Sequence, residues 1–154
     1  MGNAPAAFAS EVGVSSEVRL TPVQITSARQ INPTTVEVLY ANGQHVTFDF
    51  YGENIFRIFQ DNAGGIVRDP AAKPEAHILV NNPRRSTGGV KLETADKAVV
   101  IKTPRIAVNI DRTSGLLTVT KLATGEKVIE GVSPIEIGEK KTTITLKERD
   151  GEYF

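Results

Sequence analysis

Two corners of small, polar and glycine residues are the first features of this sequence that could bind a ligand. Thr113-Ser114-Gly115 and Ala123-Thr124-Gly125 lie about ten residues apart. Glycine-rich corners hold phosphate where a helix begins directly behind them, because its first N–H groups point at the anion. Here each corner precedes a β-type run, and Gly-Lys-Ser/Thr does not occur. We therefore interpret both corners as turns.

Side chains suited to acid–base or nucleophilic chemistry are present, but they do not form a recognisable motif. His45 and His77 have no partner at metal-ligand spacing, and no serine stands in Gly-x-Ser-x-Gly; the turn serines are Ser86, Ser114 and Ser133. The sequence therefore points to no catalytic residue, no metal ligand and no cofactor. Substrate-binding residues stay unknown at this level.

Charged side chains are numerous, and we expect most of them on solvated faces. Any two carboxylates could form an acid–base pair across a cleft, but most alternate with apolar residues; the candidates are Asp49, Asp61, Asp69, Glu75, Glu93, Asp96 and Asp111. Arg84-Arg85 could hold an anion, although a solvated turn is the favoured interpretation.

Aromatic side chains give little sign of a sugar-binding platform. The chain has no Trp, and four phenylalanines follow core patterns: Phe48, Phe50, Phe56 and Phe59. Tyr40, Tyr51 and Tyr153 are the candidate platforms, and Tyr40 belongs to the apolar face of its predicted strand.

Bulk composition limits the classes of partner. Eighteen basic and eighteen acidic residues cancel, so there is no electrostatic reason to bind nucleic acid or an anionic membrane. No apolar run approaches the ~20 residues of a spanning helix, and the chain has no Cys. We expect residues 1–16 to be a disordered leader and residues 17–154 to form one domain.

Alternation of apolar and polar residues dominates the pattern and predicts antiparallel sheets with one buried face. It is clearest in the runs 36–40, 46–50, 106–110 and 143–146, and turn signals recur every eight to twelve residues. Roughly a dozen short strands are expected, which indicates an all-β, antiparallel β-sandwich.

Register arithmetic selects the turns, because a slip of one residue turns every side chain to the opposite face. A three-residue loop, Ala41-Asn42-Gly43, pairs Val38 with Val46, whereas a two-residue loop would set Glu37 against Phe48. A four-residue loop at 112–115 pairs Ile110 with Leu117. With a further corner at 122–125, residues 106–130 form a three-stranded meander.

Two segments carry less pattern. Residues 54–60 fit a helical face or a buried strand, and their β-branched and aromatic content favours the strand. Residues 61–76 carry two prolines and form the longest irregular stretch, and long loops in compact domains are often functional.

The order of these elements resembles the N-terminal β-sandwich domain of glycoside hydrolase family 31, the α-glucosidase and α-xylosidase family. Four stretches carry the resemblance: the strand pair 36–50, Asn54-Ile55-Phe56-Arg57-Ile58, the meander 106–129, and Asp150-Gly151-Glu152-Tyr153-Phe154. In the family, a stretch like the last one leads into Tyr-Gly-x-Gly-Glu. The resemblance covers residues 18–154 and implies a galactose-mutarotase-like supersandwich.

This resemblance implies a non-catalytic accessory domain of a retaining α-glycoside hydrolase. The family's two catalytic aspartates belong to a (β/α)-barrel, so we expect a chain truncated before that barrel, and the barrel as its main partner. The loop from Asp61 to Pro74 is the expected contact with it. Location would be periplasmic or secreted. The alternatives are an independent carbohydrate-binding module, with an oligosaccharide as partner, and a mutarotase-like epimerase.

Overall fold

The computed structural model describes residues 21–60, 89–138 and 141–148. These residues form eleven strands, which confirms the all-β prediction, and none of them forms a helix able to cross a membrane. The expected leader at 1–16 and the loop from Asp61 to Pro74 lie outside the described residues.

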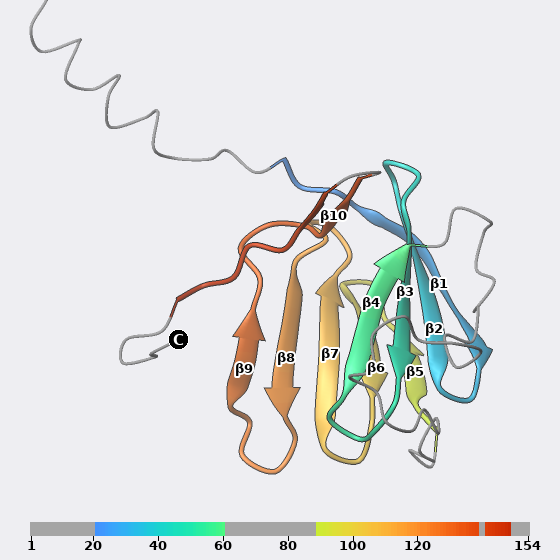
Figure 1. Cartoon of the computed structure of the whole chain (residues 1–154), viewed down its shortest axis with the longest axis vertical. Coiled ribbons are helices and arrows are strands. Elements are labelled where there is room, and N and C mark those ends of the chain that lie inside the picture. The colour runs from blue at the N-terminus through green and yellow to red at the C-terminus, as the bar shows by residue number, and fades with distance from the viewer. Residues whose placement is uncertain (1–20, 61–88, 139–140, 149–154) are drawn as a thin grey trace, which may run out of the picture.

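Two antiparallel sheets make up the body of the molecule, as Figure 1 shows. The first has the strand order β1-β2-β3-β4, with bounds Ile25–Asn32, Thr35–Tyr40, His45–Phe50 and Phe56–Gln60. The second has the order β5-β6-β7-β8-β9, with bounds Lys91–Thr94, Ala98–Lys102, Ile106–Asp111, Leu117–Lys121 and Lys127–Glu130. A small pair, β10 (Glu136–Ile137) and β11 (Thr142–Thr143), lies at one end.

The core lies between the two sheets and is built from the residues that alternate inward. Both sheets supply β-branched and aromatic side chains to one buried cluster: Val36, Val38, Tyr40, Val46, Phe48 and Phe50 from the first, and Val99, Ile101, Val108, Ile110, Leu117 and Val119 from the second. Burial of two facing apolar surfaces defines a β-sandwich, as predicted.

The predicted registers are present. Val38 pairs with Val46 and Val36 with Phe48, and Gly43 has a φ of 85° in the three-residue loop. Ile110 pairs with Leu117 and Val108 with Val119 across the next corner. The two glycines of the corners discussed above also have positive φ, 74° at Gly115 and 72° at Gly125. Residues 106–130 therefore form the expected meander.

The ambiguous segment is a strand, β4, which pairs with β3. Phe56 packs against the core, with its ring centroid 5.1 Å from that of Phe50. The prediction that Phe59 belongs to the core is wrong. Phe59 pairs with Thr47 and so shares the outer face, because apolar residues at both 58 and 59 cannot point to one side of a strand.

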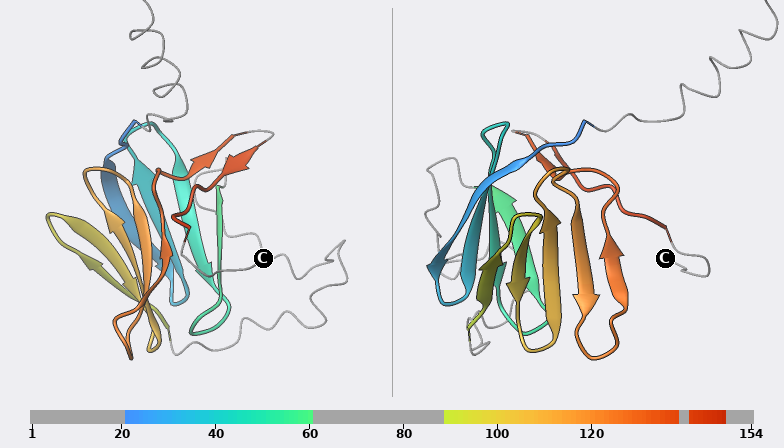
Figure 2. Two further views of the ribbon diagram at one scale, coloured as in Figure 1. Left: turned by 90° about the vertical axis from the view of Figure 1, so that its left-hand side faces the viewer. Right: turned by 180° about the vertical axis from the view of Figure 1, so that it is seen from behind.

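The two long sides of the sandwich differ. On one side β1 and β5 meet: the Gln30 side chain donates to the carbonyl of Val90 at 3.1 Å, and the Val90 amide donates to Pro33 at 2.8 Å. On the other side β8 and β9 extend beyond β4, as Figures 1 and 2 show. The inner face of β9 is therefore not covered by a strand of the first sheet.

Gly115 allows a close approach that another residue would prevent. A Cβ at this position would press on the backbone oxygen of Val23, whereas a Cβ at Gly125 would meet nothing within 4 Å. We expect Gly115→Ala to lower the free energy of unfolding by about 3 kcal/mol or more, from left-handed strain plus the clash. Gly125→Ala should cost about 1–2 kcal/mol, from left-handed strain alone. Urea unfolding measures both, and equal losses would contradict this account.

Candidate functional site

The carboxylate of the preceding residue, Asp111, accepts the hydrogen bonds of the corner at 112–115. Asp111 Oδ1 accepts the N–H groups of Thr113 at 3.0 Å and Ser114 at 2.7 Å, and the Ser114 hydroxyl at 2.7 Å. Gly115 donates its N–H to the Asp111 carbonyl at 2.8 Å. The donors that would hold a phosphate are thus occupied by a negative group. This corner is a turn, as the sequence indicates.

These hydrogen bonds lower the pKa of Asp111. The largest cause is the backbone N–H of Ser114, followed by the Ser114 hydroxyl, and the N–H of Thr113 adds to both. Each bond favours the charged form. Since the pKa is lower in the folded state, the carboxylate stabilises the protein above the ordinary Asp pKa of about 3.9.

We expect this contribution to disappear as the pH falls through the lowered pKa of Asp111. Asp111→Asn keeps an oxygen acceptor but removes the charge, so the variant should lose less stability on acidification below about pH 4 than the wild type does. Thermal unfolding across that range measures the difference. An unchanged acid slope in the variant would show that these bonds do not favour the carboxylate.

A second cluster of polar residues lies on the outer face of the first sheet. Thr35, Glu37, Thr47 and Asp49 alternate with the core residues of β2 and β3, yet all are buried. The expectation that Asp49 is solvated is therefore wrong, because Asp49 is 0% exposed. Alternation identifies the side to which a residue points. It does not reveal whether that side is covered.

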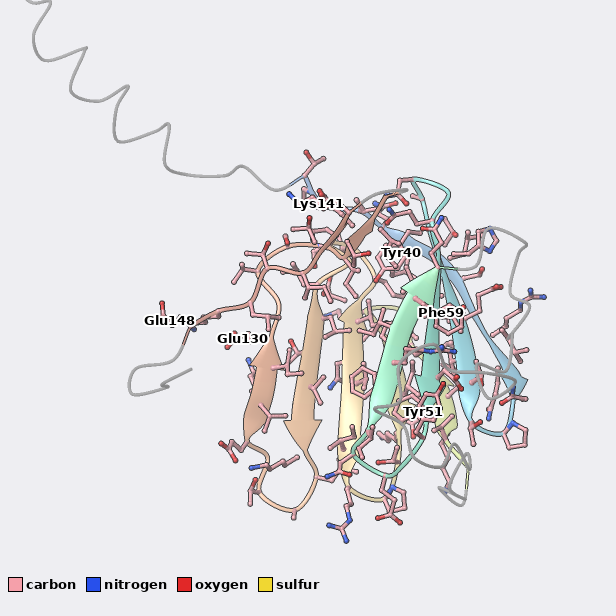
Figure 3. The ribbon with its side chains drawn as sticks, viewed as in Figure 1. Tyr40, Tyr51, Phe59, Glu130, Lys141 and Glu148 are labelled. Atoms are coloured by element: carbon pink, nitrogen blue, oxygen red, sulfur yellow. The ribbon has the colours of Figure 1, made fainter. Side chains whose placement is uncertain are left out.

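Each buried carboxylate of this outer face has its own cation. Asp49 accepts from Thr35 Oγ1 at 2.9 Å and from Arg57 Nη2 at 3.2 Å. Arg57 also lies over the Phe59 ring, 4.2 Å from its centroid, and 5.7 Å from that of Tyr51. Figure 3 shows both aromatic residues along the first sheet, distant from β9.

The second carboxylate, that of Glu37, accepts a hydrogen bond from Arg29 Nε at 2.8 Å, and its other oxygen lies 3.6 Å from His45 Nδ1. Buried carboxylates require such partners, because an unpaired charge away from water is costly. Among the described residues no group of three His, Asp or Glu side chains could hold a metal ion. Partnered in this way, the two buried carboxylates stabilise the sheet.

Removing the cation from Asp49 should be far more costly than removing a cation at the surface. We expect Arg57→Met to lower the free energy of unfolding by about 2–3 kcal/mol, because a buried carboxylate loses its charge partner. Arg105→Met is the matched control, since Arg105 binds the exposed Glu53 at 2.7 Å. Its cost should stay below about 1 kcal/mol. Similar costs in urea unfolding would contradict the proposed role of Arg57.

An apolar groove lies on the open side of the sandwich, between β4 and the overhanging β8 and β9 (Figure 1). It encloses about 520 Å³. Its floor is apolar and comes from both sheets: Phe56, Ile106, Val119, Val128 and Ile129. A register shift in the β8–β9 pairing lies beside Val119, and both Val128 and Ile129 line the groove.

The rim of this groove carries charges that are already paired. Arg105 binds Glu53 at 2.7 Å, and Lys121 binds Glu126 at 2.9 Å. Beside the lining residues, Ile55 and Leu122 are large apolar side chains that are 62% and 45% exposed. The groove therefore offers apolar surface rather than free charge.

Tyr40, His45, Ser114 and Ser133, which the structure describes, do not line this groove. Tyr40 is buried, and burial raises its pKa to about 12, so it is not a platform for a sugar. His45 lies at the start of β3, Ser133 is buried, and Ser114 belongs to the corner described above. Further candidates lie outside the described residues: His77, Ser86, Arg84, Arg85, Tyr153, Asp61, Asp69 and Glu75.

The groove itself was missed at the sequence level. Its lining comes from β4, β7, β8 and β9 and from the turns beside them. The signal available in the sequence was the pair Val128-Ile129, two adjacent apolar residues in a strand that should alternate.

Comparisons with known proteins include a distant likeness to a solved structure. No family model matches the sequence, and no curated protein matches it. Among solved structures, the chain is similar to an α-1,4-glucan lyase from Gracilariopsis lemaneiformis, with 14% sequence identity and a TM-score of 0.46. The match covers 85% of this chain and 14% of the lyase chain. A likeness at this level carries no functional conclusion.

Proposed function

We propose that this chain is a non-catalytic accessory domain of an α-glycoside hydrolase. Its role would be to pack on a catalytic (β/α)-barrel of the same parent chain and to help shape the mouth of the substrate pocket. The parent would be a retaining enzyme of glycoside hydrolase family 31 that uses two carboxylates of the barrel. We also propose that this parent enzyme acts in the periplasm or after secretion.

The observation that carries the proposal is the apolar groove on the open side of the sandwich. We expect an apolar surface of this kind to be covered in a domain that works alone. In a domain that packs on a neighbour, we expect it to be exposed until the neighbour covers it. The order of strands also supports the proposal. Three of the four stretches on which the family resemblance rests form strands in the structure: 36–50, β4 and 106–129.

The electrostatics of the described residues support a structural role as well. The buried carboxylates Glu37 and Asp49 are each held by an arginine, at 2.8 and 3.2 Å. General acid–base chemistry needs a carboxyl that can reach a substrate and change its protonation state. Within the described part of the chain, the carboxylate of the exposed Asp111 accepts hydrogen bonds from its own turn.

Two rival functions are separated by sugar measurements on the isolated chain. We expect titration with maltose or xylo-oligosaccharides to give no saturable heat, and glucose anomerisation followed by polarimetry to keep its spontaneous rate. Micromolar binding that is lost in Tyr51→Ala would favour a carbohydrate-binding module. Accelerated anomerisation that is lost in His77→Ala would favour an epimerase. Sequence downstream of Phe154 that lacks Tyr-Gly-x-Gly-Glu and a barrel would also overturn the proposal.

A further inference from the structure

The outer edge of β4 presents backbone groups that no described strand pairs. Tyr51 donates its N–H to Ile55 across the β3–β4 turn, and Phe50 donates to Thr34 on the β2 side. N–H and C=O groups point alternately to the two sides of an antiparallel strand. With the observed register, Arg57 and Phe59 therefore bond to β3, while Phe56 and Ile58 direct their N–H and C=O groups to the open side.

This edge adjoins the apolar groove. Phe56 lines the groove with its side chain and directs its backbone groups along the same side. Ile58 packs on the core beside it, opposite Phe48. A strand added at the usual spacing of about 4.8 Å from β4 would thus extend the first sheet over the groove, toward β8 and β9 (Figure 1).

The edge of the second sheet differs, because β9 already has a neighbour at one end. Lys147 donates its N–H to Glu130 at 2.8 Å, Val132 donates to Thr145 at 3.0 Å, and Gly131 forms a bridge with Leu146. Glu130 and Glu148 lie together at that edge in Figure 3. Among the described strands, the open edge next to the groove is therefore that of β4.

We propose that the groove is a docking site for one extended peptide segment. The segment pairs its backbone with Phe56 and Ile58 of β4, as a fifth strand of the first sheet, and places alternate apolar side chains on Val119, Val128 and Ile129. Main-chain hydrogen bonds hold the strand, and the groove selects its apolar face. The site would accept such a segment whether or not the parent is a glycosidase.

The overhang of the second sheet excludes antiparallel pairing with a second copy of this chain in the same position. Antiparallel pairing of β4 with β4 of another copy would make one continuous sheet, with both second sheets on the same side of it. Because β8 and β9 extend beyond β4 (Figure 1), the two overhangs would then occupy the same space. A single strand brings no second layer with it, so it fits where an antiparallel copy does not.

The chemistry of the lining also favours an apolar peptide over a sugar. The charged side chains at the rim, Arg105 and Lys121, are held by Glu53 and Glu126 of the chain itself. Phe56, the aromatic residue of the lining, is stacked on Phe50 at an interplanar angle of 28°. One face of this ring is therefore covered by Phe50.

The test uses the 154-residue chain and a short synthetic peptide in which Val alternates with Thr. We expect saturable binding with a dissociation constant below about 1 mM, and slower hydrogen exchange at the amides of Phe56 and Ile58 in the complex. A peptide of the same composition with its Val residues grouped should bind more weakly. This readout needs no variant, so it does not depend on a mutant that folds poorly.

A matched pair of variants locates the site. Val128→Lys puts a charge into the groove and should weaken binding by about tenfold or more. Val132→Lys makes the same change at a valine that is 40% exposed and does not line the groove, and should leave binding unchanged. The proposal is overturned by absence of binding, by equal effects of the two variants, by protection at β9 instead of β4, or by a dimer that Val128→Lys dissociates.

Discussion

Burial of one apolar face from each sheet is the constraint on which the rest of this structure depends. Phe48 and Phe50 of the first sheet and Val108 and Ile110 of the second belong to one core cluster, and all four are 0% exposed. Such burial stabilises by roughly 1.5–3 kcal/mol for each large apolar side chain. Because side chains alternate along a strand, this requirement also determines every register and therefore where each polar residue must point.

The glycine corners follow from that register. Ile110 can face Leu117 only if the loop between their strands reverses within four residues, and Gly115 supplies the positive φ that this reversal needs. Asp111 then satisfies the N–H groups of the turn. Features that first suggest phosphate binding are thus explained by the geometry of a hairpin.

The two sheets have different numbers of strands, and for this reason the two long sides of the sandwich differ. Four strands facing five leave the inner face of the last strand open, whereas the β1–β5 side is closed by Gln30 and Val90. The same side of the molecule thereby combines apolar side chains with the backbone groups of Phe56 and Ile58, which no strand of the described residues pairs. Both features are consistent with the proposed docking of a strand, since exposed sheet edges are templates for pairing with another chain.

Much of this fold is predictable from the sequence alone, because alternation and turn chemistry are local. The sandwich class, the pairing of Val38 with Val46, the meander 106–130 and the turn nature of both glycine corners all follow from short-range patterns. The tertiary structure decided what no local pattern contains. It decided that Asp49 is buried against Arg57, that Phe59 lies outside the core, and that Phe56, Val119 and Val128 form a groove. The physical reason is that burial depends on which surfaces come together in space, and residues 56 and 128 are brought together only when the two sheets pack.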